Sequence, residues 1–189
     1  MHTIHHTDAV ITKIADYRET SKRVWLFTRD FGLIIAVVQG VRNQGAKLQM
    51  HLREYALVRA DIVRGREVWR LTGVHVHSEV LLLGRSPRNR AYVRLLSFIQ
   101  RFVVGEDPHP ELFAHVVAVA QSLPMLSGHR EMDALALWRA LALLGYIAVT
   151  PRDEALLTSP FVEATVSLDN ATLRQCILQA DSAIAQSHL

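Results

Sequence analysis

Hydrophobic and polar residues alternate with a period of two over most of residues 8–77, and this period is typical of β-strands. In the first segment, residues 8–17, apolar residues occur on both sides of the predicted strand. This pattern predicts a strand that is paired along both edges. Short polar turns follow the first, second and fourth segments. The predicted strands are residues 8–17, 23–28, 33–39, 55–63 and 68–77.

Five short antiparallel strands within 80 residues predict a small closed barrel. An OB-fold fits this spacing, and an SH3-like barrel fits it almost as well. The loop that follows the third strand, GVRNQGAK at residues 40–47, combines glycines with cations. It is interpreted either as a ligand-binding loop or as an ordinary surface loop.

From about residue 78 the hydrophobic period lengthens toward three and a half, which indicates amphipathic helices. Asp169 is a candidate N-cap for the last of them. The weaker pattern after Tyr146 predicts an irregular crossing with at most one short strand, near residues 161–166. The predicted fold class is α+β, with a barrel domain at 1–79 and a helical domain at 80–189. The predicted helices are residues 88–104, 112–123, 131–144 and 171–185.

The first seven residues, MHTIHHT, predict a frayed lead-in rather than a metal site or a signal peptide. No apolar run approaches the length of a membrane-spanning helix, about 18 residues. The single cysteine, Cys176, cannot form an internal disulfide and is predicted to be a small buried side chain. Together these features predict a soluble cytoplasmic protein with no membrane partner.

Positive charge is concentrated in the first part of the chain. Residues 1–80 carry 12 Lys and Arg against 8 Asp and Glu, whereas residues 81–189 carry 9 against 10. A charge difference between two halves favours an anionic partner for the basic half, and nucleic acid is the commonest. An ordinary solvated surface is the alternative.

The sequence contains no recognisable catalytic motif: no phosphate-binding loop, dinucleotide fingerprint, GxSxG or HExxH. His75 and His77 point to the same side of the last predicted strand, but two ligands without a third do not make a metal site. Adjacent acidic residues at 106–107 and 153–154 are explained by helix ends and solvent. We therefore predict neither enzymatic activity nor a metal or other cofactor.

Aromatic side chains in the barrel segment offer a second way to bind nucleic acid, because exposed rings stack on bases. Phe27 and Tyr55 are predicted to be core residues, and Trp69 is left open between core and surface. The rings considered for stacking are Trp25, Phe27, Phe31, Tyr55 and Trp69.

Five short motifs in order, DYRETS, LFTRDFG, VVQGVRNQGAKL, LREYALV and RGRE, resemble the N-terminal barrel of the RecO recombination mediators. PELF at residues 110–113 and LALLGY at 141–146 are similar to the helical domain of the same family. The resemblance covers residues 8–150. It implies an OB-fold followed by a helical domain, without an enzymatic reaction.

The resemblance also implies a function in DNA repair and recombination. RecO proteins bind single- and double-stranded DNA, anneal complementary strands, work with RecR and help to load RecA onto strands covered by single-stranded-DNA-binding protein. The match of the 40–47 loop to the basic loop of the family implies DNA contacts from Arg42 and Lys47. Charge and position alone add Lys22, Arg23, Arg64 and Arg66.

In the family, the helical domain also captures the acidic C-terminal tail of single-stranded-DNA-binding protein. Arg90, Arg94 and Arg101 form a basic face on the first predicted helix and are assigned to this tail without a matching motif. A solvated helix face is the alternative for them. A wider alternative is a protein-interaction module that binds the tail or RecR without DNA activity.

The chain departs from the family after Tyr146, where RecO proteins commonly continue into a cysteine-paired zinc segment and further helices. Here 43 residues with one cysteine follow. The sequence therefore resembles a shortened member without zinc, and part of the expected RecR contact depends on the elements that differ.

Overall fold

The computed structural model describes residues 3–19, 21–39, 52–78, 87–126 and 129–187. These residues form two compact units. The first comprises residues 1–81 together with 103–110, and the second comprises residues 82–102 together with 111–189. The segment 103–110, which follows the helix α2 at Pro87–Phe102, thus belongs with the barrel strands.

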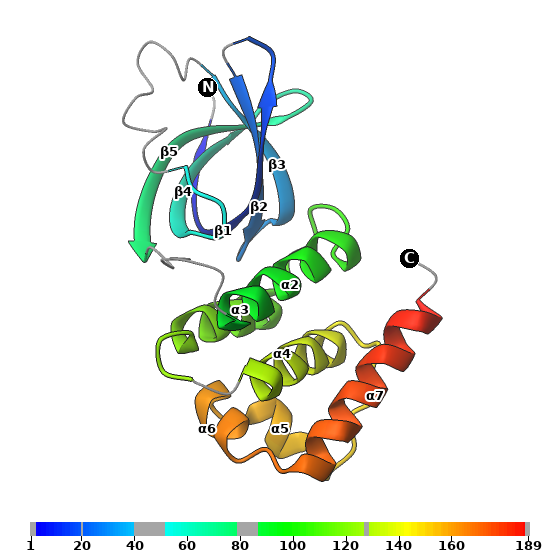
Figure 1. Ribbon diagram of the computed structural model, residues 1–189. Helices are drawn as coiled ribbons and strands as arrows, with labels where there is room; N and C mark the ends of the chain where they lie inside the picture. Colours follow the sequence, from blue (N-terminus) through cyan, green and yellow to red (C-terminus); the bar gives the residue numbers. More distant parts are fainter. Residues whose placement is uncertain (1–2, 20, 40–51, 79–86, 127–128, 188–189) are drawn as a thin grey trace. The chain divides into compact units, whose positions relative to one another are not determined.

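Five strands make up the first unit, and they curl into a barrel (Figure 1). The strand order is β1-β2-β3-β5-β4, closed, with β3 and β5 pairing in parallel and the other pairs antiparallel. A five-stranded closed barrel in this order is an OB-fold, as the sequence predicts. The strands are β1 Ile4–Tyr17, β2 Ser21–Thr28, β3 Gly32–Val38, β4 Leu57–Arg64 and β5 Trp69–Ser78.

Strand β1 is long enough to pair with β4 through its first half and with β2 through its second half. This confirms the prediction that it is paired on both edges. It begins at Ile4, so the expectation of a frayed lead-in over residues 1–7 is wrong for the described part of that segment. His5 and His6 lie opposite Ile62 and Asp61 of β4.

Apolar side chains from all five strands fill the barrel interior. The inward set includes Ile11, Val24, Leu26 and Ile34, each nearly fully buried. Their period of two along each strand directs the alternate side chains to the outer side of the barrel, where Lys13, Arg23 and Ile35 are exposed and Val10 and Phe27 are buried.

The second unit is helical. Helix α4 is its centre and contacts both α2 and α7 (Figure 1). Trp138 of α4 is fully buried and donates a 2.6 Å hydrogen bond from Nε1 to Gln179 of α7. The helices are α2 Pro87–Phe102, α3 Pro110–Ser122, α4 His129–Leu143, α5 Glu154–Thr158, α6 Phe161–Val166 and α7 Asn170–Gln186.

The region after Tyr146 corrects one prediction. Residues 161–166, expected to form at most a short strand, are the helix α6. The prediction for α7 is confirmed, including its cap: the Asp169 side chain accepts a 2.7 Å hydrogen bond from the Thr172 backbone N–H. Among the described residues, no helix has both the length and the apolar composition needed to cross a membrane.

Residues 103–110 pack against the turn between β2 and β3. The Leu33 backbone N–H donates a 3.1 Å hydrogen bond to the Gly105 carbonyl. Gly32 has a φ of +67°, and a Cβ at this position would lie 2.4 Å from the Asp107 carbonyl oxygen. Only glycine satisfies both conditions, so this residue fixes the segment against the barrel.

Candidate nucleic-acid interface

The outer surface of β1, β2 and β3 combines cations with aromatic rings. A β-bulge between Ile11 and Lys13 turns the second half of β1, so that Lys13 lies opposite Trp25 of β2. Arg23 lies opposite Val37 of β3, which in turn pairs with Arg70 of β5. We call this surface the cation-aromatic face: Lys13, Tyr17, Arg23, Trp25, Ile35 and Arg70.

Two rings on this face carry cations over them. Lys13 Nζ is 5.0 Å from the centroid of the Trp25 ring. The guanidinium of Arg23 is 4.1 Å from the Tyr17 ring centroid, and that of Arg18 is 5.1 Å from it. A hydrogen bond from Arg23 and the positive charge of Arg18 lower the pKa of the Tyr17 hydroxyl. The local potential is therefore positive.

Within the described residues, no carboxylate comes within 4.0 Å of a cationic nitrogen of Lys13, Arg23 or Arg70. Lys22, at the edge of the face, lies 3.9 Å from Asp16, whose side chain is 92% exposed. An exposed pair at this distance is weak and leaves the Lys22 ammonium accessible. The face therefore presents cations that are not neutralised by ion pairs.

A second outer surface, on the first half of β1, β4 and the end of β5, has a different character. His6 Nδ1 lies 2.6 Å from Asp61 Oδ1, and His75 Nε2 lies 3.6 Å from Asp61 Oδ2. His77 Nε2 lies 3.2 Å from Asp8 Oδ1. We call this surface the histidine-carboxylate face: His6, Asp8, Arg59, Asp61, His75 and His77.

His75 and His77, considered in the sequence as two ligands of one metal, thus contact different carboxylates. Among the residues that the structure describes, no group of three or more His, Cys, Asp or Glu has an arrangement that could hold a metal ion. Asp8 also pairs with Arg29 at 3.4 Å. The two carboxylates of this face are therefore paired within the barrel, whereas Arg59 has no carboxylate within 4.0 Å among the described residues.

Arg64, predicted to contact DNA, takes part in a cluster at the turn between β4 and β5. Its guanidinium lies 5.2 Å from the Trp69 ring centroid and pairs with Glu106 at 2.9 Å. Trp69 is 4% exposed and donates a 2.9 Å hydrogen bond from Nε1 to the same carboxylate. Glu106, explained in the sequence by a helix end, therefore joins Arg64 and Trp69. Arg66 is exposed in the adjoining turn.

Two other predicted contacts, Arg42 and Lys47, lie outside the described residues. Among the aromatic residues, Phe27 is buried as predicted, whereas Tyr55 is only partly buried. Trp69, which the sequence left open, is a core residue. Trp25 is half-buried on the outer surface, which leaves part of its ring in contact with solvent.

In the helical unit, Arg90 and Arg94 of α2 line a pocket of about 330 Å³ together with residues from the start of α4. Arg94 pairs with Asp133, and burial raises the pKa of that carboxyl despite the nearby Arg94 charge. Arg130, which the sequence did not single out, adds positive charge, and His129 also lines the pocket. The lining consists of Arg90, Ala91, Arg94, His129, Arg130 and Asp133.

Arg101, the third residue assigned to a peptide tail, is not part of this pocket. It lies two helical turns beyond Arg94, with its guanidinium 5.8 Å from the Phe102 ring centroid. Phe102 is buried against Phe98 and Tyr146. The predicted basic face of α2 is exposed, but only its first half borders a pocket.

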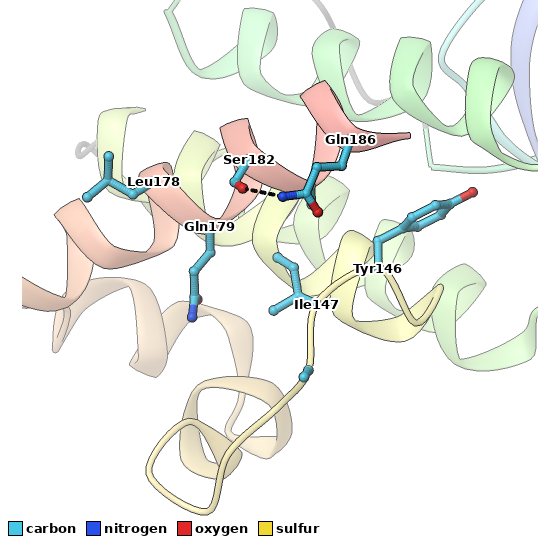
Figure 2. A pocket seen from close by; sticks show the side chains of 8 residues that line it. Tyr146, Ile147, Leu178, Gln179, Ser182 and Gln186 are labelled. Atoms are coloured by element: carbon cyan, nitrogen blue, oxygen red, sulfur yellow. Dashed lines mark hydrogen bonds between the residues drawn. The ribbon is translucent and has the colours of Figure 1, made fainter. Parts of the chain in front are cut away.

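A second hollow, of about 370 Å³, lies between α7 and the segment that follows α4 (Figure 2). Its lining is uncharged and mixes apolar side chains with amides. Gln186 donates a 3.1 Å hydrogen bond to Ser182 along the α7 side. The lining consists of Tyr146, Ile147, Ala148, Leu178, Gln179, Ser182, Ala183 and Gln186.

Two buried basic side chains of the helical unit, His115 and Arg139, have structural partners. His115 lies 2.9 Å from the Ala136 carbonyl oxygen, and burial lowers its pKa to about 4. Arg139 donates hydrogen bonds to the carbonyls of Leu156 and Ser159, at the end of α5, and burial lowers its pKa to about 10. Cys176 is buried as predicted, and burial raises its pKa to about 11.

Sequence reasoning missed Lys13, Tyr17 and Arg70 as members of a common surface. Positive charge is the signal that the sequence offers for Lys13 and Arg70, and the alternation of β2 places Arg23 and Trp25 on one side of that strand. The parallel pairing of β3 with β5 cannot be predicted from local sequence. This pairing places Arg70 beside Val37, which lies opposite Arg23.

Comparison with known proteins agrees with this architecture. Residues 1–79 match the family described as "Recombination protein O N terminal". The DNA repair protein RecO of Pseudomonas paraeruginosa is 34% identical over 137 residues, which cover 69% of this chain and 54% of that protein. The DNA repair protein RecO of Prosthecochloris aestuarii is 26% identical over 172 residues, covering 86% and 62% respectively.

The chain thus spans little more than half the length of these curated relatives. The segments matched by these two relatives are 172 and 137 residues long, so each begins in the barrel and extends into the helical unit. The family match over residues 1–79 and the two relatives lead to the same conclusion: the chain belongs to the RecO family.

Proposed function

We propose that this chain acts in DNA repair and recombination by binding nucleic acid on the cation-aromatic face of its barrel. The observation that carries the proposal is the absence, among the described residues of that face, of carboxylates paired with Lys13, Arg23 or Arg70. Unpaired cations beside half-buried rings suit a flexible polyanion. The name of its relatives, DNA repair protein RecO, supports the same role.

Within this role we rank the candidate contacts by their surroundings. Arg23 belongs to the face itself, and Lys22 stands at its edge with one weak ion pair. Arg64 contributes less, because Glu106 neutralises its charge. Arg66 is exposed in the β4–β5 turn. Arg42 and Lys47 remain candidate contacts because the 40–47 loop is similar to the basic loop of the family.

We further propose the finer activities of the family for this chain. It anneals complementary strands and helps to load the recombinase RecA onto DNA covered by single-stranded-DNA-binding protein, in concert with RecR. These steps need binding and positioning without bond chemistry, so the proposed role is not enzymatic and requires no cofactor. Single- and double-stranded DNA are the proposed ligands.

Binding of a labelled single-stranded oligonucleotide over a series of salt concentrations tests the proposal. Affinity should fall steeply as salt rises, because bound phosphates release counterions. Arg23→Gln and Arg70→Gln should each reduce the slope of log affinity against log salt by about 0.7. Arg59→Gln, the same change on the histidine-carboxylate face, is the matched control and should leave the slope unchanged. Absence of binding at low salt would exclude the proposal.

A second function is favoured by the pocket that Arg90 and Arg94 border in the helical unit. We propose that it holds an acidic peptide segment, as expected for the tail of single-stranded-DNA-binding protein. Arg130 adds charge to the pocket, whereas Arg94 is already paired with Asp133. Because Arg101 lies outside the pocket, its contribution should be smaller.

A peptide with acidic residues and an apolar end, titrated into the full chain, tests this second function. Arg90→Gln together with Arg130→Gln should weaken binding about a hundredfold, since two charge-assisted hydrogen bonds of about 1.5 kcal/mol each are lost. Arg101→Gln serves as the control with the same charge change outside the pocket. Equal losses in both variants would indicate a diffuse charge effect instead of a site.

A further inference from the structure

Helix α7 has one side that the helical unit does not use. The helix contacts α4, and its buried side chains repeat every three or four residues: Leu173, Cys176, Ala180 and Ala183. With 3.6 residues per turn, nearly the opposite side of the helix carries four side chains at the same repeat, and all four are exposed. We call them the α7 stripe: Arg174, Leu178, Asp181 and Ala185.

Leu178, the large apolar member of the stripe, borders the hollow between α7 and the segment after α4 (Figure 2). Its side chain is 69% exposed. The hollow itself is uncharged, and the small side chains of Ala148 and Ala183 leave its volume at about 370 Å³. A single exposed leucine is ordinary on a protein surface. Here, however, the projecting leucine and an uncharged hollow belong to one patch.

A patch that contains both a projection and a hollow is suited to a second copy of itself. In a two-fold dimer the same surface of each protomer meets the other, so every contact is made twice. Leu178 of each protomer can then enter the hollow of its partner. The absence of charge in the lining suits this apolar side chain better than the acidic peptide proposed for the pocket of Arg90 and Arg94.

The charges of the α7 stripe select the direction of such a pair. Arg174 lies four residues before Leu178, and Asp181 lies three residues after it. The two charges are about 10 Å apart along the helix, too far to pair with each other. In the part of the chain that the structure describes, neither has an ion pair within 4.0 Å. Antiparallel helices bring opposite charges together, whereas parallel helices bring like charges together.

We infer that α7 is a self-association site, at which two copies of this chain pair through antiparallel α7 helices. Each Leu178 occupies the partner's hollow, and Arg174 of one copy lies near the partner's Asp181. The inference concerns the helical unit and does not depend on the nucleic-acid binding proposed above. Because each protomer contributes one large apolar side chain and one charge of each sign, the dimer should be weak and reversible.

Sedimentation equilibrium of the full chain, from micromolar to near-millimolar concentration, tests the inference. The mean mass should rise with concentration toward that of two chains. Leu178→Asp should weaken the dimer at least a hundredfold, because two leucine side chains are lost from the interface. Val166→Asp is the matched control. Val166 is 74% exposed on α6 and does not line the hollow, so this variant should associate as the unaltered chain does.

Charge reversal tests the antiparallel direction. Arg174→Asp and Asp181→Arg should each weaken the dimer about tenfold, because two attractive pairs become two repulsive ones. The double variant restores opposite charges and should recover most of the loss. Failure of this recovery would overturn the antiparallel pairing. A single-chain mass at every concentration, or a dimer that Leu178→Asp does not weaken, would overturn the inference as a whole.

Discussion

The two outer faces of the barrel contain similar charged groups but use them in opposite ways. On the histidine-carboxylate face, Asp8 and Asp61 each lie within 4.0 Å of two basic side chains. On the cation-aromatic face, Lys13 and Arg23 lie over rings instead. The comparison shows that the pairing of charges, more than their number, marks the surface available to a polyanion.

Glycine at position 73 maintains the pairing on the histidine-carboxylate face. A Cβ there would lie 2.4 Å from Asp61 Oδ2 and 3.2 Å from Asp61 Cβ. Gly73→Ala should displace the carboxylate from His6 and lower the free energy of unfolding by about 1–2 kcal/mol. Urea unfolding measures this loss.

The background variant Asp61→Ala provides the control for this clash. Once the carboxylate is absent, the added methyl at position 73 has only the Asp61 Cβ position to avoid, and most of the cost should disappear. A cost that is equal in both backgrounds would mean that Gly73 is required by the backbone of β5. The contrast between the two faces would then not depend on it.

Neutralising one aspartate on each side compares the two faces directly. Asp16→Asn frees Lys22 at the edge of the cation-aromatic face, whereas Asp61→Asn makes the same charge change on the other face. At 0.15 M salt, where charges are screened beyond about 8 Å, Asp16→Asn should raise oligonucleotide affinity about twofold and Asp61→Asn should not.

The oligonucleotide affinities of the same two variants should become similar at low ionic strength. The screening length reaches about 30 Å at 0.01 M salt, so the protein's total charge then governs attraction at either position. Titrations at both salt concentrations measure the effect. If Asp61→Asn strengthened binding as much as Asp16→Asn at 0.15 M salt, the ligand would not be confined to the cation-aromatic face.

The barrel could be predicted from sequence because its core residues alternate within short segments bounded by turns. Strict alternation fails in β5 between the core residues Leu71 and Val74, and in β1, where it would place Lys13 on the same side as the core residue Ile11. The bulge between them reverses the side and carries Lys13 outward. Local sequence does not reveal a bulge that is defined by a partner strand.

The helical unit illustrates a different limit. The segment FVEATV, residues 161–166, is rich in β-branched side chains and favours a strand by propensity. It is helical in a context of tertiary contacts: Phe161 is buried beside His115 and the Arg139 guanidinium. Burial of one ring outweighs the modest propensity of a six-residue segment.

The ionisation of Tyr17 offers the finest measure of the difference between the faces. The hydrogen bond from Arg23, with the charge of Arg18, lowers its pKa below that of free tyrosine. Tyr17 should therefore ionise at lower pH than Tyr55 and Tyr92, whose pKa values burial raises. Phenolate absorbance during an alkaline titration records these steps, and Tyr17→Phe identifies the first of them by removing it.

The sign of the coupling to stability follows from the lowered pKa. Because the folded state favours the Tyr17 phenolate, this group adds stability above the pKa of the unfolded chain, and the contribution is lost as pH falls through the folded pKa. Arg23→Gln should move the Tyr17 titration to higher pH, whereas Arg59→Gln on the histidine-carboxylate face should leave it in place. If Arg23→Gln left the pH of the Tyr17 titration unchanged, the guanidinium would not lie over this ring in solution. The cation-aromatic face would then lose one of its two paired rings.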